Sequence, residues 1–189
     1  ENLIAELVIE DKIINVKQLG AYGDNIHDDT LKLQLAINKA EDNQTIYIPN
    51  GEYKITKQNT KNLIGYSTTT AIPYGLLIYD KDNINIKCEG VLKPDLTTEN
   101  IVCLFVQTAT NISINGLKGE YTDEPNNLTH LYVKNLIVVN NSENVKITNT
   151  YSKNVGGNTL FIYSKNSNIE NSQAERTDTN HKSNAIFGA

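Results

Sequence analysis

The second half of the chain repeats itself, and this repeat most narrows the folds that the sequence can adopt. Each repeat consists of an apolar strand, a four-residue polar corner, an asparagine and a second strand of alternating polarity. Four segments align without gaps, starting at Leu76, Leu104, Ile137 and Phe161, and their aligned asparagines are Asn83, Asn111, Asn144 and Asn168. The spacing between these asparagines corresponds to single coils of a solenoid, in which each unit buries its apolar side chains against the next. The pattern predicts an all-β protein of stacked coils.

The two strands of each repeat differ in polarity. In the second strand apolar and polar residues alternate, as in Ile84-Asn85-Ile86, which is typical of a sheet with one face in the core and one in water. The first strand is apolar on both faces, as in Leu76-Leu77-Ile78, and needs cover on both. We expect a second copy of the chain to supply that cover in a homotrimer. Alternatively, the segment from Lys57 to Tyr74 or a further C-terminal part covers this sheet.

Residues 13–56 precede the repeats and have a different pattern: a strand, a glycine-containing acidic turn, a helix and a second strand. Gly20 and Gly23 allow backbone angles that residues with a Cβ atom resist. Asp28 or Asp29 can accept hydrogen bonds from the first N–H groups of the helix. This part of the chain is therefore predicted to fold as one strand–helix–strand unit.

The helix of this unit is predicted to begin near Thr30 and to end at Asp42-Asn43. Its apolar positions recur at spacings of three and four, which is typical of an amphipathic helix that rests on a core. These positions are Leu33, Ala36, Ile37 and Ala40, with Leu31 and Leu35 widening the apolar stripe.

The same segment carries a resemblance to a known family. The matching residues are Val16, Gly20-Ala21-Tyr22-Gly23-Asp24, Asp28-Asp29-Thr30, Ala36-Ile37 and Ile48-Pro49-Asn50-Gly51-Glu52-Tyr53, with Asn25 where the family usually has a third glycine. This order resembles the opening of the pectate-lyase-like right-handed β-helix family, over about a quarter of the chain. The resemblance implies a right-handed parallel β-helix with one short N-terminal capping α-helix. It also implies structural roles for Gly20, Gly23, Asp24, Asp28, Asp29, Thr30, Pro49 and Gly51.

The domain organisation follows from these two patterns. We expect a lead-in segment at residues 1–12, the N-terminal cap of the β-helix at residues 13–56, and its coils at residues 57–189. A length of 189 residues suits one domain rather than two. The sequence contains no methionine, so we expect it to be an excerpt or a processed piece of a longer chain.

Charge and hydropathy exclude several classes of partner. The net charge of −5 and the isoelectric point near 5.2 argue against nucleic acid and anionic membranes, because no basic stripe is present to neutralise phosphates. No apolar run approaches the roughly 20 residues of a membrane span, so no membrane insertion is expected. Asparagine is abundant, and it suits tight turns with left-handed backbone angles as well as stacked side-chain amide ladders.

Few residues have the context of a catalytic or metal site. Cys88 and Cys103 are fifteen positions apart without a nearby histidine pair, which favours buried thiols over metal ligands and leaves a disulfide open. We expect no metal and no cofactor. His27, His130 and His181 are isolated from one another, and none has the context of a nucleophile and its base.

Glycan cleavage needs two carboxylates, or a base beside acidic residues. The densest such cluster is Glu170, Glu175, Arg176 and Asp178, followed by His181, and it is the candidate catalytic site. The alternative is a solvated corner with an Asp–Arg pair. Asp123-Glu124 and the pair Asp80 and Asp82 are weaker candidates. The Asn-Thr-Asp, Asp-Asp and Gly-His-Gly motifs of the polygalacturonase branch do not occur after the capping helix.

The resemblance implies two classes of function, because β-helices that open in this way include phage tail spikes as well as secreted polysaccharide lyases and hydrolases. The first hypothesis is a homotrimeric bacteriophage tail spike or appendage, located in the virion tail beside other tail proteins, that attaches to a bacterial surface glycan. The second is a secreted or virion-borne polysaccharide lyase or glycoside hydrolase. A purely architectural virion connector is the third. The sequence leaves the polysaccharide and the enzymatic status open.

Overall fold

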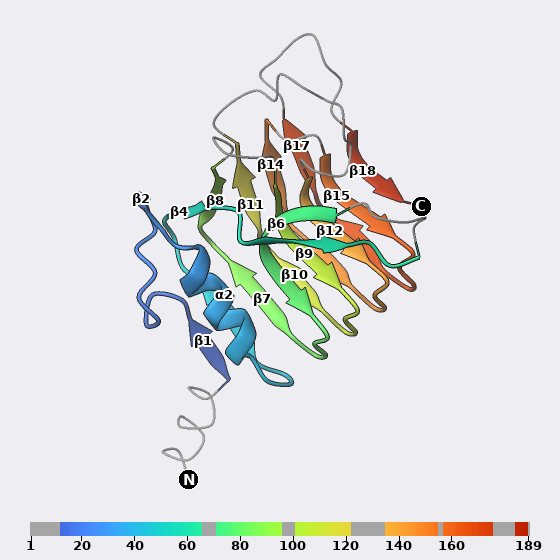
Figure 1. Ribbon diagram of the computed structural model, residues 1–189, viewed down its shortest axis with the longest axis horizontal. Helices are drawn as coiled ribbons and strands as arrows, with labels where there is room; N and C mark the ends of the chain where they lie inside the picture. Colours follow the sequence, from blue (N-terminus) through green and yellow to red (C-terminus); the bar gives the residue numbers. More distant parts are fainter. Residues whose placement is uncertain are drawn as a thin grey trace.

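The computed structural model describes residues 12–65, 71–95, 101–121, 135–154, 157–175 and 184–188. Three sheets of stacked strands form a right-handed parallel β-helix with one described helix at its N-terminal end, which confirms the predicted fold class (Figure 1). Every described strand pair is parallel except β5 with β6.

We name the sheets A, B and C. Successive coils each add one strand to sheets A and B, while sheet C begins with the antiparallel pair β5 and β6 and then gains one strand per coil. Sheet A contains β1 (Ile13–Asn15), β3 (Thr45–Ile48), β7 (Asn85–Cys88), β10 (Ser113–Asn115), β13 (Lys146–Thr148) and β16 (Asn168–Glu170). Sheet B contains β2 (Asp24–Asp28), β4 (Glu52–Ile55), β8 (Val91–Pro94), β11 (Lys118–Glu120), β14 (Tyr151–Lys153) and β17 (Gln173–Glu175). Sheet C contains β5 (Asn59–Asn62), β6 (Ala71–Tyr79), β9 (Val102–Gln107), β12 (Asn135–Asn140), β15 (Gly157–Ile162) and β18 (Asn184–Gly188).

The predicted stacking of the repeats is confirmed for three segments and shifted by two residues in the fourth. Leu76 pairs with Leu104, and Leu104 with Ile137. Phe161, however, pairs with Val139, and Thr159 occupies the position opposite Ile137. The fourth repeat therefore begins at Thr159, and its corner asparagine is Asn166 rather than Asn168.

This slip has a simple origin. The fourth corner carries asparagines at both 166 and 168, and strands repeat every two residues, so a shift of two keeps every side chain on its face. Ile169 points into the core in either register and pairs with Ile147. The backbone distinguishes the two asparagines, because Asn166 has a φ of 49°, close to the 56° of Asn83 at the first corner.

Helix α2 (Thr30–Lys39) begins where the sequence predicts and takes the place of a sheet C strand between β2 and β3. Leu33, Ala36 and Ile37 are buried in the core below it. The wider stripe was a wrong prediction, because Leu31 is 70% exposed and Leu35 37% exposed. Helix α2 also ends earlier than predicted, since Ala40 is already extended.

The two aspartates before α2 stabilise different parts of the N-terminal cap. The buried Asp29 carboxylate accepts hydrogen bonds from the backbone N–H groups of Tyr22 (2.6 Å) and Gly23 (2.8 Å). The Asp28 carboxylate accepts the N–H of Thr30 (3.0 Å), the first residue of the helix. Asp28 therefore caps α2, and Asp29 instead fixes the acidic turn.

The glycine turn of the cap leaves no room for larger residues. Gly23 has a φ of 60°, and a Cβ atom there would lie 2.9 Å from the Tyr53 ring. A Cβ atom on Gly51 would lie 2.9 Å from the carbonyl oxygen of Gly23. The Tyr53 hydroxyl donates to the carbonyl oxygen of Pro49 (2.8 Å), which completes the packing of this corner.

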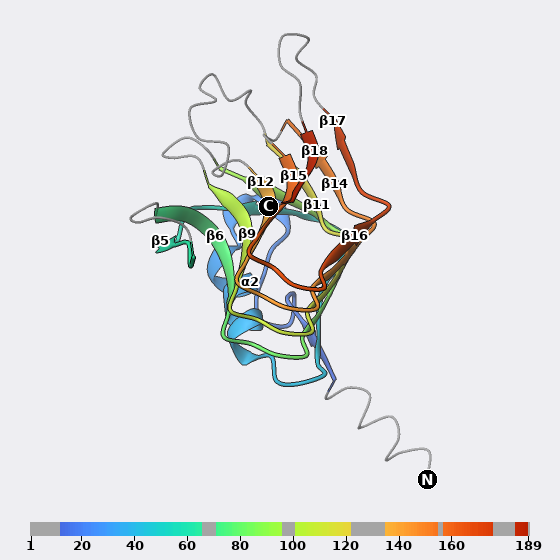
Figure 2. The same ribbon diagram turned by 90° about the vertical axis from the view of Figure 1, so that its right-hand side faces the viewer.

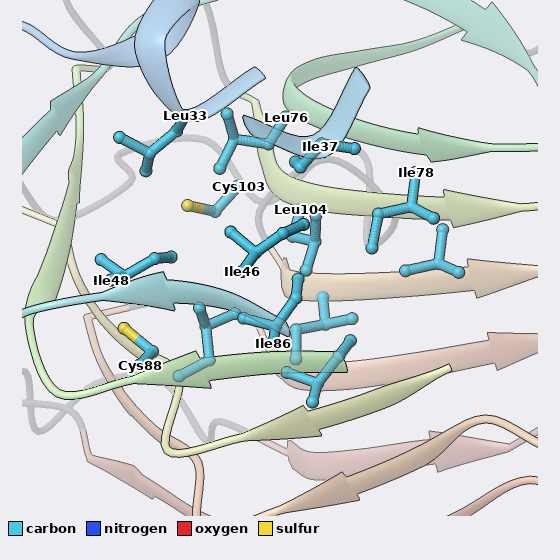
Figure 3. Close-up of a cluster of buried hydrophobic side chains, with 14 of the residues drawn as sticks. Leu33, Ile37, Ile46, Ile48, Leu76, Ile78, Ile86, Cys88, Cys103 and Leu104 are labelled. Carbon is cyan, nitrogen blue, oxygen red and sulfur yellow. The ribbon is translucent and has the colours of Figure 1, made fainter. Parts of the chain in front are cut away.

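The core is a column of aliphatic side chains enclosed by the three sheets and α2 (Figure 3). The labelled residues are Leu33 and Ile37 of α2, Ile46 and Ile48 of β3, Leu76 and Ile78 of β6, Ile86 and Cys88 of β7, and Cys103 and Leu104 of β9. Both cysteines are buried free thiols, and burial raises the pKa of Cys88 to about 11.

The outer face of sheet C is covered by the chain itself. β5 and the first part of β6 pair as an antiparallel hairpin, which crosses the outside of the coils (Figures 1 and 2). We call residues 57–65 with residues 71–75 the hairpin arm. Its Leu63 and Ile72 are buried against a second apolar cluster that includes Phe105, Val138 and Leu160 of sheet C.

Polar contacts fix the hairpin arm to the coils. Asn140 of β12 accepts the backbone N–H of Ile64 (2.8 Å) and donates to its carbonyl oxygen (3.0 Å). Gln107 of β9 donates to the carbonyl oxygen of Asn62 (2.8 Å). Cover by the segment from Lys57 to Tyr74 is thus the alternative that the structure bears out, and the inference that sheet C must be covered by another copy was wrong. The sheet therefore gives no reason to expect a trimer.

Candidate functional site

The structure describes two members of the predicted acidic cluster, and they lie on different sheets. Glu170 lies in β16 of sheet A, where it accepts a hydrogen bond from Asn168 (2.9 Å) and faces Lys146 (3.8 Å). Glu175 lies in β17 of sheet B and accepts the hydroxyl of Tyr151 (2.5 Å), which raises the pKa of Tyr151 to about 12.

The remaining members of that cluster, Arg176 and Asp178, lie outside the described residues, as do His181 and Asp123-Glu124. Glu170 and Glu175 both have neighbouring partners within the sheets, and neither lines the groove described below. The catalytic assignment therefore stays a prediction.

The structure instead brings residues together along the corner between sheets C and A. A groove of about 300 Å³ runs there across four coils, and we call it the corner groove. Its lining residues are Asp80, Asp82, Thr108, Ala109, Thr110, Asn141, Ser142, Glu143, Tyr163 and Lys165. Neighbouring parallel strands lie about 4.8 Å apart, so the first and fourth coils are separated by about 14 Å along the axis.

One column of the corner groove has an unusual backbone. Among the described residues, thirteen non-glycine residues have positive φ, and ten of them are asparagine. The other three are Asp80 (52°), Thr108 (53°) and Tyr163 (51°). All three line the corner groove, and they occupy equivalent positions in their coils, with Asn141 (48°) as the fourth member.

The presence of residues other than asparagine in this column matters, because a left-handed backbone costs about 1–2 kcal/mol for residues other than glycine, asparagine and aspartate. Threonine is especially unfavourable there, since its β-branch crowds the backbone. Asparagine fills this conformation at the other described corners. Residues with a strained backbone are concentrated at functional sites, and here asparagine would be less strained. The column therefore marks the corner groove as a candidate site.

A ladder of corner asparagines directly follows the lining residues Asp82, Thr110 and Glu143 in the sequence. The side-chain amide of Asn111 donates to Asn83 (2.9 Å), and that of Asn144 donates to Asn111 (3.0 Å). The ladder starts on the Asp42 carboxylate, which accepts the amide of Asn83 (3.0 Å). These bonds run from coil to coil and hold the corner rigid.

The floor of the groove is formed by small buried residues. Ala109 is 2% exposed, and Ser142 is 5% exposed. The Ser142 hydroxyl accepts the backbone N–H of Ala109 (3.2 Å) and donates to the carbonyl oxygen of Asn140 (2.9 Å). The hydrogen-bonding groups of the floor residues therefore already have partners, and the longer side chains of the groove are the ones available to contact a ligand.

Tyr163 is the aromatic group of the groove, and the hairpin arm positions it. Its side chain is 57% exposed. A Cβ atom on Gly65 of the arm would lie 3.0 Å from the Tyr163 ring, so the ring rests against the bare backbone of this glycine. One face of an amphipathic ring is thereby supported while much of the side chain stays open to solvent.

Sequence reasoning had singled out Asp80 and Asp82 only weakly and had missed Thr108, Glu143, Tyr163 and Lys165. The signal was present in the repeats. With the fourth repeat in its observed register, Asp82, Thr110, Glu143 and Lys165 fall in one column, and isolated parallel bridges join them from coil to coil. The two-residue slip had removed Tyr163 and Lys165 from that alignment.

Two kinds of feature are absent from the described residues. They contain no group of three or more histidine, cysteine or acidic side chains placed to hold a metal ion. They also contain no helix with the length and hydrophobicity needed to cross a bilayer.

Three stacked sheets, a capping helix and asparagine-lined corners define the chain as a pectate-lyase-like parallel β-helix with a polar groove along one corner. Comparison with family models agrees, because the model for "Rhamnogalacturonase A/epimerase, pectate lyase-like" matches residues 13–187. The chain belongs to this family.

One curated relative is the plasmin and fibronectin-binding protein A of Streptococcus pneumoniae. It is 28% identical over 195 residues, which covers 92% of this chain and 26% of the relative. The chain thus spans about a quarter of the length of this relative.

Solved structures show the same fold. The S. pneumoniae surface adhesin PfbA superposes with a TM-score of 0.62 at 19% identity, covering 90% of this chain and 40% of the adhesin chain. A family 28 exopolygalacturonase of Yersinia enterocolitica gives 0.63 at 14% identity, with 94% and 48% covered. The tailspike of Escherichia coli bacteriophage HK620, solved with a pentasaccharide, gives 0.54 at 11% identity, with 90% and 36% covered. At these identities the likeness concerns the fold alone.

Proposed function

We propose that this chain is an extracellular attachment module that binds a bacterial surface polysaccharide along the corner groove. The observation that carries the proposal is the column of Asp80, Thr108 and Tyr163, which line the groove. Their backbones are left-handed, a conformation that asparagine adopts at the other described corners. The fold shared with the HK620 tailspike, which was solved in complex with a pentasaccharide, and with the surface adhesin PfbA supports the same class of function.

The shape of the corner groove suits an extended glycan. It follows the axis of the solenoid over about 14 Å, enough for roughly three sugar units. Its lining combines hydrogen-bonding groups with one open tyrosine ring, on which the apolar face of a sugar can stack. Because the stacked coils are rigid, the contacts are held in register before the ligand arrives, which lowers the entropic cost of binding.

A binding experiment with matched tyrosine variants tests the proposal. We expect Tyr163→Ala to weaken binding of the chain to bacterial surface polysaccharide at least tenfold without lowering the unfolding temperature. Tyr22→Ala is the control, because Tyr22 is also 57% exposed but lies in the N-terminal cap. Equal binding by both variants, or no binding by the unmodified chain, would overturn the proposal.

The finer hypothesis is a homotrimeric phage tail spike that works beside other virion tail proteins. A bacterial surface adhesin is the competing source of the same activity, and the relative's name adds plasmin and fibronectin as ligands. Light scattering distinguishes the two: a trimer in solution supports the tail spike, and a monomer supports the adhesin. Immobilised fibronectin belongs in the same binding series, and binding to it alone would contradict a glycan receptor.

A polysaccharide-degrading enzyme is the second candidate, favoured by acids that line one groove. Asp82 and Glu143 lie two coils apart, which is about 10 Å between their backbones. Paired carboxylates of inverting glycosidases lie about 6.5–9.5 Å apart. Shortening of the polysaccharide by the unmodified chain, abolished in Asp82→Asn and Glu143→Gln, would support this candidate. Loss in Glu170→Gln and Glu175→Gln instead would favour the acidic cluster near the C-terminus.

A further inference from the structure

Several acidic side chains on the outer faces of the coils form ion pairs with lysines. On sheet B, Lys93 contacts Glu120 (2.6 Å) and Glu52 (3.4 Å). Lys54 likewise contacts Asp95 (3.0 Å). The carboxylates of the corner groove have no such partner among the described lysines.

Three carboxylates line the corner groove, and none forms an ion pair with any described lysine. They are Asp80, Asp82 and Glu143. Lys81, between the two aspartates, turns away and donates to the carbonyl oxygens of Asn38 (3.0 Å) and Ala40 (2.8 Å) at the end of α2.

The charge of the groove is therefore unbalanced. Lys165 is the one cation among its lining residues, against the three carboxylates. A ligand with several negative charges would face repulsion along the groove, whereas a cationic ligand would find three carboxylates that no described lysine neutralises. The Glu143 carboxylate accepts one long hydrogen bond, from the side-chain amide of Asn166 (3.3 Å), which adds no positive charge.

The end of β9 adds unsatisfied polar atoms at the same corner. Within the described chain, the side-chain oxygens of Gln107 and Thr108 are buried without a hydrogen-bond partner. Gln107 is 1% exposed, and Thr108, the next residue, lines the groove. Gln107 does not line the groove, because its amide donates to Asn62 of the hairpin arm and to Asn140. The unsatisfied group at the groove is therefore the Thr108 hydroxyl, which can both accept and donate a hydrogen bond.

We infer that the glycan bound in the corner groove carries free amino groups. This inference rests on the proposed function and adds the chemical class of the ligand. Each sugar ammonium supplies three donors and one positive charge, which pairs with the groove carboxylates in charge-assisted hydrogen bonds. N-acetylation removes that charge, so the acetylated form of the same sugar binds more weakly, and glycans built of uronate or sulfated sugars are excluded.

Short oligosaccharides test this inference and avoid the nonspecific attraction of a polycation for an acidic protein. Binding of the full chain is measured by calorimetry with glucosamine oligomers, with the same oligomers after complete N-acetylation, and with uronate oligomers. We expect the free amines to bind at least tenfold more tightly than the acetylated form, and the uronates not to bind. Raising the salt concentration weakens the amine binding, because screening reduces charge pairing.

Charge-removing variants locate the effect. The double variant Asp82→Asn with Glu143→Gln should lose at least tenfold in affinity for the amine, while Glu41→Gln, which removes an exposed carboxylate outside the corner groove, keeps it. Equal affinity for both oligomers, or an unaffected double variant, overturns the inference.

The two proposals fail in different ways. If acetylated or uronate oligomers bind and Tyr163→Ala removes that binding, the corner groove is still a glycan site and only the assignment of an amino sugar is wrong. The assignment is also wrong if no oligomer binds while the surface polysaccharide still binds and Tyr163→Ala weakens that binding. If neither the oligomers nor the surface polysaccharide bind, the proposed function itself is contradicted.

Discussion

Thr108 is the residue at which local stability and the proposed role of the groove conflict most clearly. It is β-branched, its φ is 53°, and its hydroxyl is buried without a partner in the described chain. Asn141, two equivalent positions along the column counted from Asp80, shows that asparagine fits this backbone. The threonine is therefore maintained at a cost to folding.

We expect Thr108→Asn to raise the free energy of unfolding by about 1 kcal/mol, because asparagine tolerates the left-handed backbone better. The same variant should bind the glycan at least fivefold more weakly, since it changes the groove lining. Urea unfolding and calorimetry measure the two effects.

The reverse substitution at a ladder position is the control. Asn111→Thr places threonine at a φ of 56° and removes two side-chain hydrogen bonds of the ladder, so it should lower stability by about 1–2 kcal/mol. If Thr108→Asn is instead destabilising, the backbone at residue 108 is not under strain, and the argument for the site fails.

Sequence patterns predicted the left-handed asparagines but not the exceptions. Each corner needs a residue with a left-handed backbone, and the repeated asparagines indicate this conformation at Asn83, Asn111 and Asn144. Nothing in a threonine or a tyrosine signals this conformation, because their own preference is against it. Thr108 and Tyr163 are recognised only once the coils are stacked in register.

At the scale of elements, the cap shows how two adjacent carboxylates acquire different roles. Burial alone would raise the pKa of Asp28, but hydrogen bonds from Thr30 and Thr56 outweigh it and hold the pKa below its ordinary value. A lowered pKa means that the folded state favours the ionised form. The resulting stabilisation is complete above the unfolded pKa of about 3.9 and is lost as the pH falls through the folded value.

The variant Asp28→Asn removes this titration. We expect the unmodified chain to lose urea stability below about pH 4, and Asp28→Asn to be less stable at neutral pH with a flatter pH dependence. Unfolding midpoints between pH 2 and pH 7 give the comparison. Parallel curves for both proteins would show that the Asp28 carboxylate does not link folding to pH.

The hairpin arm depends on Asn140, which is fully buried and bonds both backbone groups of Ile64. Asn140→Ala leaves both groups of Ile64 without this partner and removes one of the two acceptors of the Gln107 amide, so it should cost about 1–3 kcal/mol. Hydrogen exchange at the described residues of the arm should rise with it.

The neighbouring Asn141→Gly serves as the matched variant, because glycine keeps the left-handed backbone and Asn141 is exposed. It should cost less than about 1 kcal/mol and leave exchange in the arm unchanged. Equal exchange in the two variants would mean that Asn140 does not secure the arm.

On the scale of the whole molecule, the repeats and the cap were sufficient to predict the β-helix. Period-two alternation in Ile84-Asn85-Ile86 and its equivalents gives sheet A one buried face, and the residues around Gly23 and Asp29 define the closed end. Each of these signals is local in sequence and is repeated or shared by several positions.

The cover of sheet C was not predictable with the same certainty, because it depends on contacts over long sequence separations. Leu63 and Ile72 sit in a polar stretch rich in threonine and asparagine, which resembles an ordinary surface loop. Only their packing on Phe105 and Val138 shows that the stretch returns across the coils. The corner groove has the same origin, since its residues come from four separate coils.

The most direct test of the account is residue-resolved: amide chemical shifts of the isotope-labelled chain, recorded during titration with the oligosaccharide that binds best. We predict that the shifts cluster at 80–82, 108–110, 141–143 and 163–165, the four corners that line the groove. Shifts confined to the outer face of sheet B, or the absence of any perturbation at these corners under saturating ligand, would contradict it.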